Sequence, residues 1–227
     1  GPVQAYSATV SGGSPDTRYF FSSTYQKDVG VLFWNWAKKL NLRSNIDTHL
    51  TEDLGVSLSM GYTNSQDRLV REGTESIMEG VEFGSARFLP DHRCRTNPGF
   101  GCDLFDGFIS NAVPARDRSL YNQQFLDRFN GSLTFEYSPL SWLTTRLTTG
   151  VDVTSELDVQ YRDFQTNDTV IASLGAVASK GFRNEGRWTH FLTTTDLSST
   201  ANVNLTPGLA AGTSVGVQFY TKTISYL

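Results

Sequence analysis

The sequence is poor in charged residues and contains no long apolar run. Only 19% of its 227 residues are charged, compared with roughly 25% in ordinary soluble domains. The net charge of −4 indicates no basic surface of the kind that nucleic-acid binding requires. No segment approaches the ~20 apolar residues of a membrane-spanning helix, which excludes a helical membrane protein.

Residues that carry catalysis or metal binding are equally scarce. The chain has two Cys and three His residues, and the histidines are scattered at positions 49, 92 and 190. There is no Ser–His–Asp order, no HExxH, no P-loop and no dinucleotide fingerprint. We therefore expect no enzymatic activity, no catalytic residue, no cofactor and no metal site.

What the sequence does contain is a strong period-two alternation of apolar and polar residues, which is typical of strands with one apolar and one wet face. Each alternating run has roughly 10 residues, longer than the ~5–6 of an ordinary strand. The runs form pairs, and they predict about eight antiparallel strands. They lie at 4–10 and 17–26, 39–50 and 54–63, 128–137 and 143–153, and 196–205 and 211–220.

The connections alternate between short turns and long loops. Turns at 51–53, 138–141 and 206–208 are tight, whereas 64–126 and 154–187 are long and irregular. Strands of about ten residues, tilted by about 45°, span the ~25 Å apolar band of an outer-membrane barrel, which also has short turns on one side and long loops on the other. The pattern predicts an all-β, antiparallel, up-and-down transmembrane β-barrel, with a long extracellular loop near 64–126.

In such a barrel the wet face lines the lumen, where charged side chains face water or brace a plug. Charged residues on the wet side of the alternation are the candidates for this position. The predicted lumen-facing residues are Lys39, Arg43, Asp47, Arg128, Glu136, Arg146 and Asp152.

Two alternatives remain open. A self-contained eight-stranded barrel with an adhesive or structural role must fill its interior with side chains, but the row Gly55, Ser57, Ser59, Gly61 is small and favours a wide lumen. A secreted carbohydrate-binding β-sandwich also has alternating strands, although they are normally shorter. The chain begins without an initiator Met and ends inside a predicted strand, so we expect a piece of a larger protein.

Three stretches carry a family resemblance. The turn Ser11-Gly12-Gly13-Ser14, the strand start Thr17-Arg18-Tyr19 and the run Asn41-Leu42-Arg43-Ser44-Asn45-Ile46-Asp47 resemble the early barrel of SusC/RagA-type TonB-dependent transporters. Lys38 and Lys39 depart from the pattern, because we would expect an Arg and an aromatic residue there.

The resemblance implies that residues 1–227 are about eight strands of a 22-stranded barrel domain, with the plug domain outside the chain. It also implies bacterial outer-membrane import of a large nutrient, either an oligosaccharide or a peptide. TonB would supply the energy and a SusD-like lipoprotein lid would capture the solute.

Two further pairs of residues are candidates for specific roles. Cys94 and Cys102 are eight residues apart around Pro98-Gly99, and in an exported protein a disulfide is the favoured interpretation, with metal binding as the alternative. Trp34 and Trp36 lie between two predicted strands. They could contact solute or the lid, although an interfacial aromatic belt is the commoner role.

Overall fold

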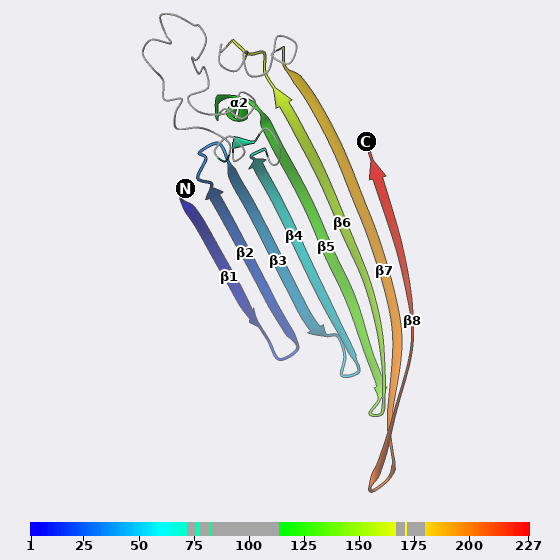
Figure 1. Ribbon diagram of the computed structural model, residues 1–227. Coiled ribbons are helices and arrows are strands. Elements are labelled where there is room, and N and C mark those ends of the chain that lie inside the picture. Colours follow the sequence, from blue (N-terminus) through cyan, green and yellow to red (C-terminus); the bar gives the residue numbers. More distant parts are fainter. Residues whose placement is uncertain (72–75, 78–81, 83–113, 167–170, 172–179) are drawn as a thin grey trace, which may run out of the picture.

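The computed structural model describes residues 1–71, 76–77, 82, 114–166, 171 and 180–227. These residues form one antiparallel sheet of eight strands in sequence order (Figure 1), which confirms the predicted all-β, up-and-down class. The strands are β1 (Val3–Gly13), β2 (Thr17–Val29), β3 (Trp36–His49), β4 (Leu54–Leu69), β5 (Tyr121–Leu140), β6 (Leu143–Arg162), β7 (Phe182–Thr206) and β8 (Leu209–Tyr226).

The register keeps apolar and polar residues on opposite faces of the sheet. Leu42 lies opposite Ser23 and Tyr62, while its neighbour Arg43 lies opposite Ser22 and Gly61. We call the side that carries Leu42 the apolar face and the side that carries Arg43 the polar face. Because side chains alternate along a strand, a shift of one residue would move every Leu and Val of a strand to the polar face.

The strands are joined at one end by tight turns, which we call the short-turn end. At the β1–β2 turn, Ser14 N donates to Thr17 O at 2.7 Å and Thr17 N donates to Ser14 Oγ at 3.2 Å. Gly13 has a φ of 153°, and a Cβ at this position would lie 2.1 Å from Thr17 O. The Gly-Gly turn noted in the sequence therefore needs glycine at its second position for steric reasons.

At the opposite, long-connection end the strands are longer than predicted. β4 continues to Leu69 and β5 begins at Tyr121, so the connection spans 70–120 instead of 64–126. Likewise β6 ends at Arg162 and β7 begins at Phe182, so the second connection spans 163–181 instead of 154–187. The prediction stopped early because both faces of β4 become polar beyond Tyr62 and the alternation disappears, although the hydrogen-bonded ladder continues.

A short helix, α2 (Pro114–Ser119), lies at the long-connection end just before β5. Ser119 and Arg118 attach it to the strand ends: Arg162 Nε donates to Ser119 Oγ at 3.2 Å, and Arg68 Nη2 donates to the Arg118 carbonyl at 3.1 Å. No helix within the described residues is long and apolar enough to cross a membrane.

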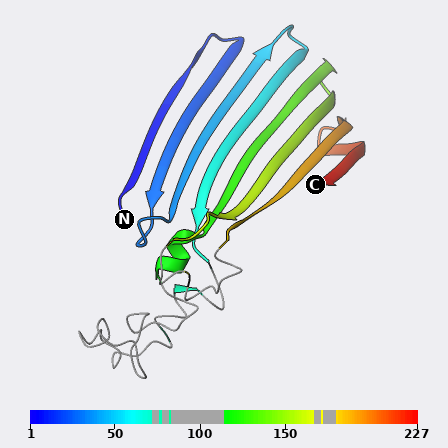
Figure 2. The same cartoon turned by 90° about the horizontal axis from the view of Figure 1, so that it is seen from above.

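The eight strands form a single curved layer whose two edges, β1 and β8, lie far apart (Figures 1 and 2). Within the described ranges this is neither a closed eight-stranded barrel nor two packed sheets, so both alternative folds are wrong. The layer covers little of its own apolar surface. Only Trp34, Ile77, Leu120 and Val159 are buried hydrophobic residues there, while side chains such as Val10, Val215 and Phe219 are more than half exposed.

Candidate functional site

The polar face is the candidate functional surface. The register places all seven predicted lumen-facing residues on it, distributed over three strands. They are Lys39, Arg43 and Asp47 on β3, Arg128 and Glu136 on β5, and Arg146 and Asp152 on β6. That this face lines a lumen stays a prediction.

Four of these seven residues form two cross-strand ion pairs. Arg128 Nε and Nη2 donate to the two carboxylate oxygens of Asp152 at 3.1 and 2.5 Å. Arg146 Nε and Nη2 both donate to Glu136 Oε2 at 3.1 and 2.5 Å. The arginine side chains are 51% and 58% exposed, so these pairs are wet and individually contribute little to stability. Each pair joins one positive and one negative side chain, so these four residues add no net charge to the polar face.

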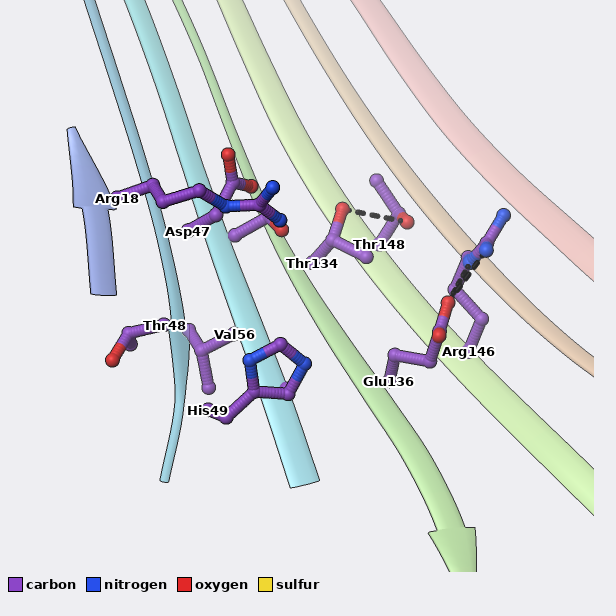
Figure 3. A pocket seen from close by; sticks show the side chains of 11 residues that line it. Arg18, Asp47, Thr48, His49, Val56, Thr134, Glu136, Arg146 and Thr148 are labelled. Atoms are coloured by element: carbon purple, nitrogen blue, oxygen red, sulfur yellow. Dashed lines mark hydrogen bonds and ion pairs between the residues drawn. The ribbon is translucent and has the colours of Figure 1, made fainter. Parts of the chain in front are cut away.

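Near the short-turn end the polar face contains an open hollow of about 370 Å³. Arg18, Asp47, His49, Glu136 and Arg146 line it, and Figure 3 shows the Arg18 side chain extending toward Asp47. On the neighbouring strands a hydroxyl–hydroxyl contact of 3.0 Å joins Thr134 and Thr148. The side chains that line this hollow carry charges of both signs and hydroxyl groups, so it is a hydrated surface. The lining residues named here do not form a catalytic arrangement.

Toward the long-connection end the polar face carries an aromatic pair that the sequence analysis missed. The rings of Trp188 on β7 and Tyr226 on β8 lie with centroids 5.2 Å apart. Trp188 lies over Gly186, where a Cβ would come within 2.9 Å of its ring. A signal was available: Trp188 shares the parity of the polar residues His190 and Asp196, not that of the apolar residues Phe191 and Leu197.

Hydrogen-bonding groups lie beside this aromatic pair. Glu156 is directly opposite Trp188 in the β6–β7 register. The Gln124 amide donates to Glu156 Oε1 at 2.7 Å and to Asp158 Oδ1 at 3.1 Å. A partly exposed aromatic ring next to carboxylates can stack on an apolar ring or alkyl surface while the carboxylates accept hydrogen bonds from hydroxyl or ammonium groups.

The two tryptophans singled out from the sequence lie elsewhere. Trp34 is 8% exposed, and its Nε1 donates to Asp117 Oδ2 of α2 at 3.1 Å. Trp36 begins β3 on the apolar face, with Lys38 Nζ 4.7 Å from its ring centroid. Neither ring belongs to the polar-face set, and their contact with solute or a lid stays a prediction.

The other candidate pair, Cys94 and Cys102, lies outside the described residues, and its disulfide stays a prediction. Within the described ranges, no group of three or more His, Cys, Asp or Glu side chains is placed to hold a metal ion.

The apolar face differs sharply from the polar face in where its charges lie. Every charged residue on it lies toward the long-connection end, and none lies between them and the short turns. They are Lys27, Lys38, Arg68, Asp127, Arg183, Glu185 and Arg187. The charge-free part, which we call the apolar band, extends on β5 over a segment of nine residues, from Phe129 to Tyr137, of which every second side chain lies on this face. Tilted by about 45°, a strand segment of this length crosses roughly the apolar thickness of a bilayer.

The chain is similar to known receptors in sequence and in fold. No family model matches it. The TonB-dependent receptor P26 of Formosa agariphila is 26% identical over 198 residues, which cover 82% of this chain and 19% of that receptor. Among solved structures, the RagAB peptide transporter has a TM-score of 0.68 at 14% identity, over 99% of this chain and 25% of that one. The ferric-catecholate import receptor Fiu of E. coli K12, in its open form, has a TM-score of 0.58 at 10% identity, over 98% and 32%.

The structural similarities, at such low identity, establish the fold alone. The chain spans about a fifth of the length of the receptor P26, in agreement with an open sheet that is part of a larger barrel. These relatives are receptors and transporters, not enzymes, as the scarcity of catalytic motifs predicted.

Proposed function

We propose, from the premise that this chain is part of the barrel of a TonB-dependent receptor, that the complete protein imports a large nutrient across the bacterial outer membrane. In this role the eight strands form part of the transmembrane wall. The apolar band faces lipid and the polar face lines the lumen, with the long-connection end outside the cell. Solute binding and a gated path make up the mechanism, and no bond is made or broken.

The observation that carries this proposal is the separation of the two faces within one open sheet. A charge-free band of about the right height, backed by a wet face with paired charges, fits a strand wall between lipid and water. A soluble protein would have to cover that band with other elements, since large exposed apolar surfaces otherwise associate.

For the solute we propose a peptide or an oligosaccharide. RagAB is by name a peptide transporter, and its TM-score of 0.68 exceeds the 0.58 of the ferric-catecholate import receptor Fiu. Trp188 and Tyr226 provide a stacking surface near the long-connection end, and Glu156 beside them provides hydrogen-bond acceptors. Such a surface fits a sugar ring or a peptide that carries an amine.

The proposed partners follow the SusC/RagA resemblance. TonB would transmit energy to a plug domain inside the complete barrel, and a SusD-like lipoprotein would close over the long-connection end. Outer-membrane lipid would cover the apolar band.

The test is uptake by cells that express the complete receptor with its lipoprotein partner. Fluorescently labelled peptide and oligosaccharide mixtures are supplied to cells with and without TonB, and the receptor is located by membrane fractionation. We expect the receptor in the outer membrane and uptake of one solute class only when TonB is present.

Single substitutions then test the proposed solute contact. Trp188→Ala should reduce uptake several-fold, because Trp is among the residues whose removal from a binding surface weakens binding most. Trp142→Ala is the matched control: Trp142 lies at the short-turn end, where its carbonyl accepts a hydrogen bond from Asn202 N at 2.8 Å and its side chain is exposed. Recovery of the receptor from the soluble fraction, or TonB-independent uptake, would overturn the proposed function; equal uptake by both variants would overturn the solute contact.

A further inference from the structure

The charges on the apolar face are mostly positive. Five of the seven are basic, namely Lys27, Lys38, Arg68, Arg183 and Arg187. The polar face of the same strands is balanced, with seven basic and eight acidic residues. The positive excess at the long-connection end is therefore confined to the face that the proposed function turns toward lipid.

Several of these charges are already engaged within the protein. Asp127 accepts hydrogen bonds from Tyr62 Oη at 2.6 Å and Asn64 Nδ2 at 2.8 Å. Arg183 Nε donates to Glu185 Oε1 at 2.6 Å. Arg68 lies over the ring of Tyr121 at 4.1 Å. The contacts above do not involve the two lysines of this face, Lys27 and Lys38.

Lys27 and Lys38 lie directly opposite each other on β2 and β3. Like charges in directly opposed positions destabilise a strand pair. Among the ion pairs of the described residues, neither lysine has a carboxylate partner. Within the described ranges, the only contact of either ammonium with an aromatic ring is that of Lys38 with Trp36, at 4.7 Å. Two cations thus lie side by side with no anion from the described chain between them.

The position of Lys27 and Lys38 next to the apolar band indicates which kind of anion could bind between them. The next residues on this face toward the short-turn end are Tyr25 and Leu40, opposite each other, with Tyr6 on the far side of Tyr25. Tyr and Trp rings concentrate at the headgroup level of a bilayer. Lysine stems lie along apolar surface while their ammonium groups reach the polar layer. In the orientation of the proposed function, the two ammonium groups therefore lie at the depth of lipid phosphates.

We propose that Lys27 and Lys38 together bind the phosphate of an anionic lipid headgroup in the leaflet at the long-connection end. The bound phosphate offsets the repulsion between the two lysines and sets the depth of this part of the wall in the membrane. This inference rests on the proposed membrane-spanning role, but it requires neither TonB nor a particular solute.

Lys39 provides a matched control within the same strand. It follows Lys38 in the sequence but lies on the polar face, opposite Gln26 and Ser65. If the phosphate is recognised by the lipid side of the wall, loss of the Lys39 charge leaves lipid binding unchanged. If any lysine near this end of β3 attracts anionic lipid, Lys39→Gln acts like the other substitutions.

The experiment uses the complete receptor reconstituted in phosphatidylcholine vesicles that contain phosphatidylglycerol with a photoactivatable headgroup. After illumination, peptide mapping measures the label on the segments around Lys27 and Lys38. We expect strong labelling of the unmodified receptor and of Lys39→Gln. Labelling of the double variant Lys27→Gln/Lys38→Gln should fall about 25-fold, since each of the two basic residues near a membrane surface contributes a factor of roughly five.

Two further arms keep the result interpretable. Lys27→Arg/Lys38→Arg retains both charges and should retain the label, which separates loss of charge from misfolding. Photoactivatable phosphatidylcholine, which has no net charge, should label these segments only weakly. Equal labelling of the Gln double variant, equal loss in Lys39→Gln, or equal labelling by the two lipids would overturn the inference. A receptor that binds phosphatidylglycerol as expected but imports no tested nutrient would overturn only the proposed substrate.

Discussion

The two faces of this sheet are made by alternate residues of the same eight strands, yet they treat charge in opposite ways. The polar face distributes fifteen charged residues along its length and pairs some of them, as in Arg128 with Asp152. The apolar face has seven, all near the long-connection end. Backbone and strand length are common to both faces, so the difference is the one expected if, as proposed, one face contacts water and the other a medium that cannot solvate charge.

The largest expected effect comes from placing a charge in the apolar band. Leu133 lies on the apolar face opposite Leu58, and its neighbour Ser132 lies on the polar face opposite Ser59 and Gly150. In the complete receptor, Leu133→Arg should lower the free energy of unfolding from lipid vesicles by about 2–4 kcal/mol, whereas Ser132→Arg should cost less than about 1 kcal/mol. Urea unfolding followed by heat-dependent gel mobility measures both. Similar losses for the two variants would mean that the faces do not differ in solvent.

An intermediate effect on the free energy of unfolding is expected where the apolar band ends, on the side of the long-connection end. Tyr62 Oη donates to Asp127 at 2.6 Å, so Tyr62→Phe removes one of the two hydrogen bonds that hold this carboxylate. The free energy of unfolding should fall by about 1 kcal/mol. Tyr137→Phe, at the other end of the band, is the control, because its hydroxyl makes no hydrogen bond within the described part of the chain; that variant should unfold like the unmodified protein. No difference between the two would show that Asp127 is solvated by water alone.

The smallest effect is expected on the polar face. A double-mutant cycle with Glu136→Ala and Arg146→Ala should give a coupling energy of about 0.2–1 kcal/mol, because both side chains are wet. Added salt should reduce this coupling further. The Arg128–Asp152 pair, which uses both carboxylate oxygens, should give the larger coupling of the two. Coupling well above this range at either pair would indicate that the polar face is shielded from water.

Much of the fold could be predicted because the alternation of single residues carries it. The runs around Leu40–Ile46 and Phe129–Tyr137 predict both strand and face, and the short turns follow from the breaks between them. The end of β4 nearest the long connection could not be predicted in this way, because Asn64 and Gln66 make both of its faces polar while the backbone ladder continues. On β6 the alternation does continue, through Leu157 and Val159, and the prediction ended that strand too early. Trp188 was missed for the opposite reason: an aromatic residue on the polar side of the alternation looks like an interruption of the pattern until its neighbours across the sheet are known.

The sequence by itself determined which residues share a face, because the period of two in a strand is a local property of the backbone. It also determined where the short turns lie, since Gly13 and the Ser-, Pro- and Gly-containing breaks interrupt the alternation. Only the tertiary structure decided which of those residues meet. The strand register brings Lys27 opposite Lys38, Glu156 beside Trp188, and Arg128 within reach of Asp152, which lies diagonally across from it on the neighbouring strand. These pairings join residues far apart in the chain, and register is a property of two strands together that neither strand's sequence contains alone.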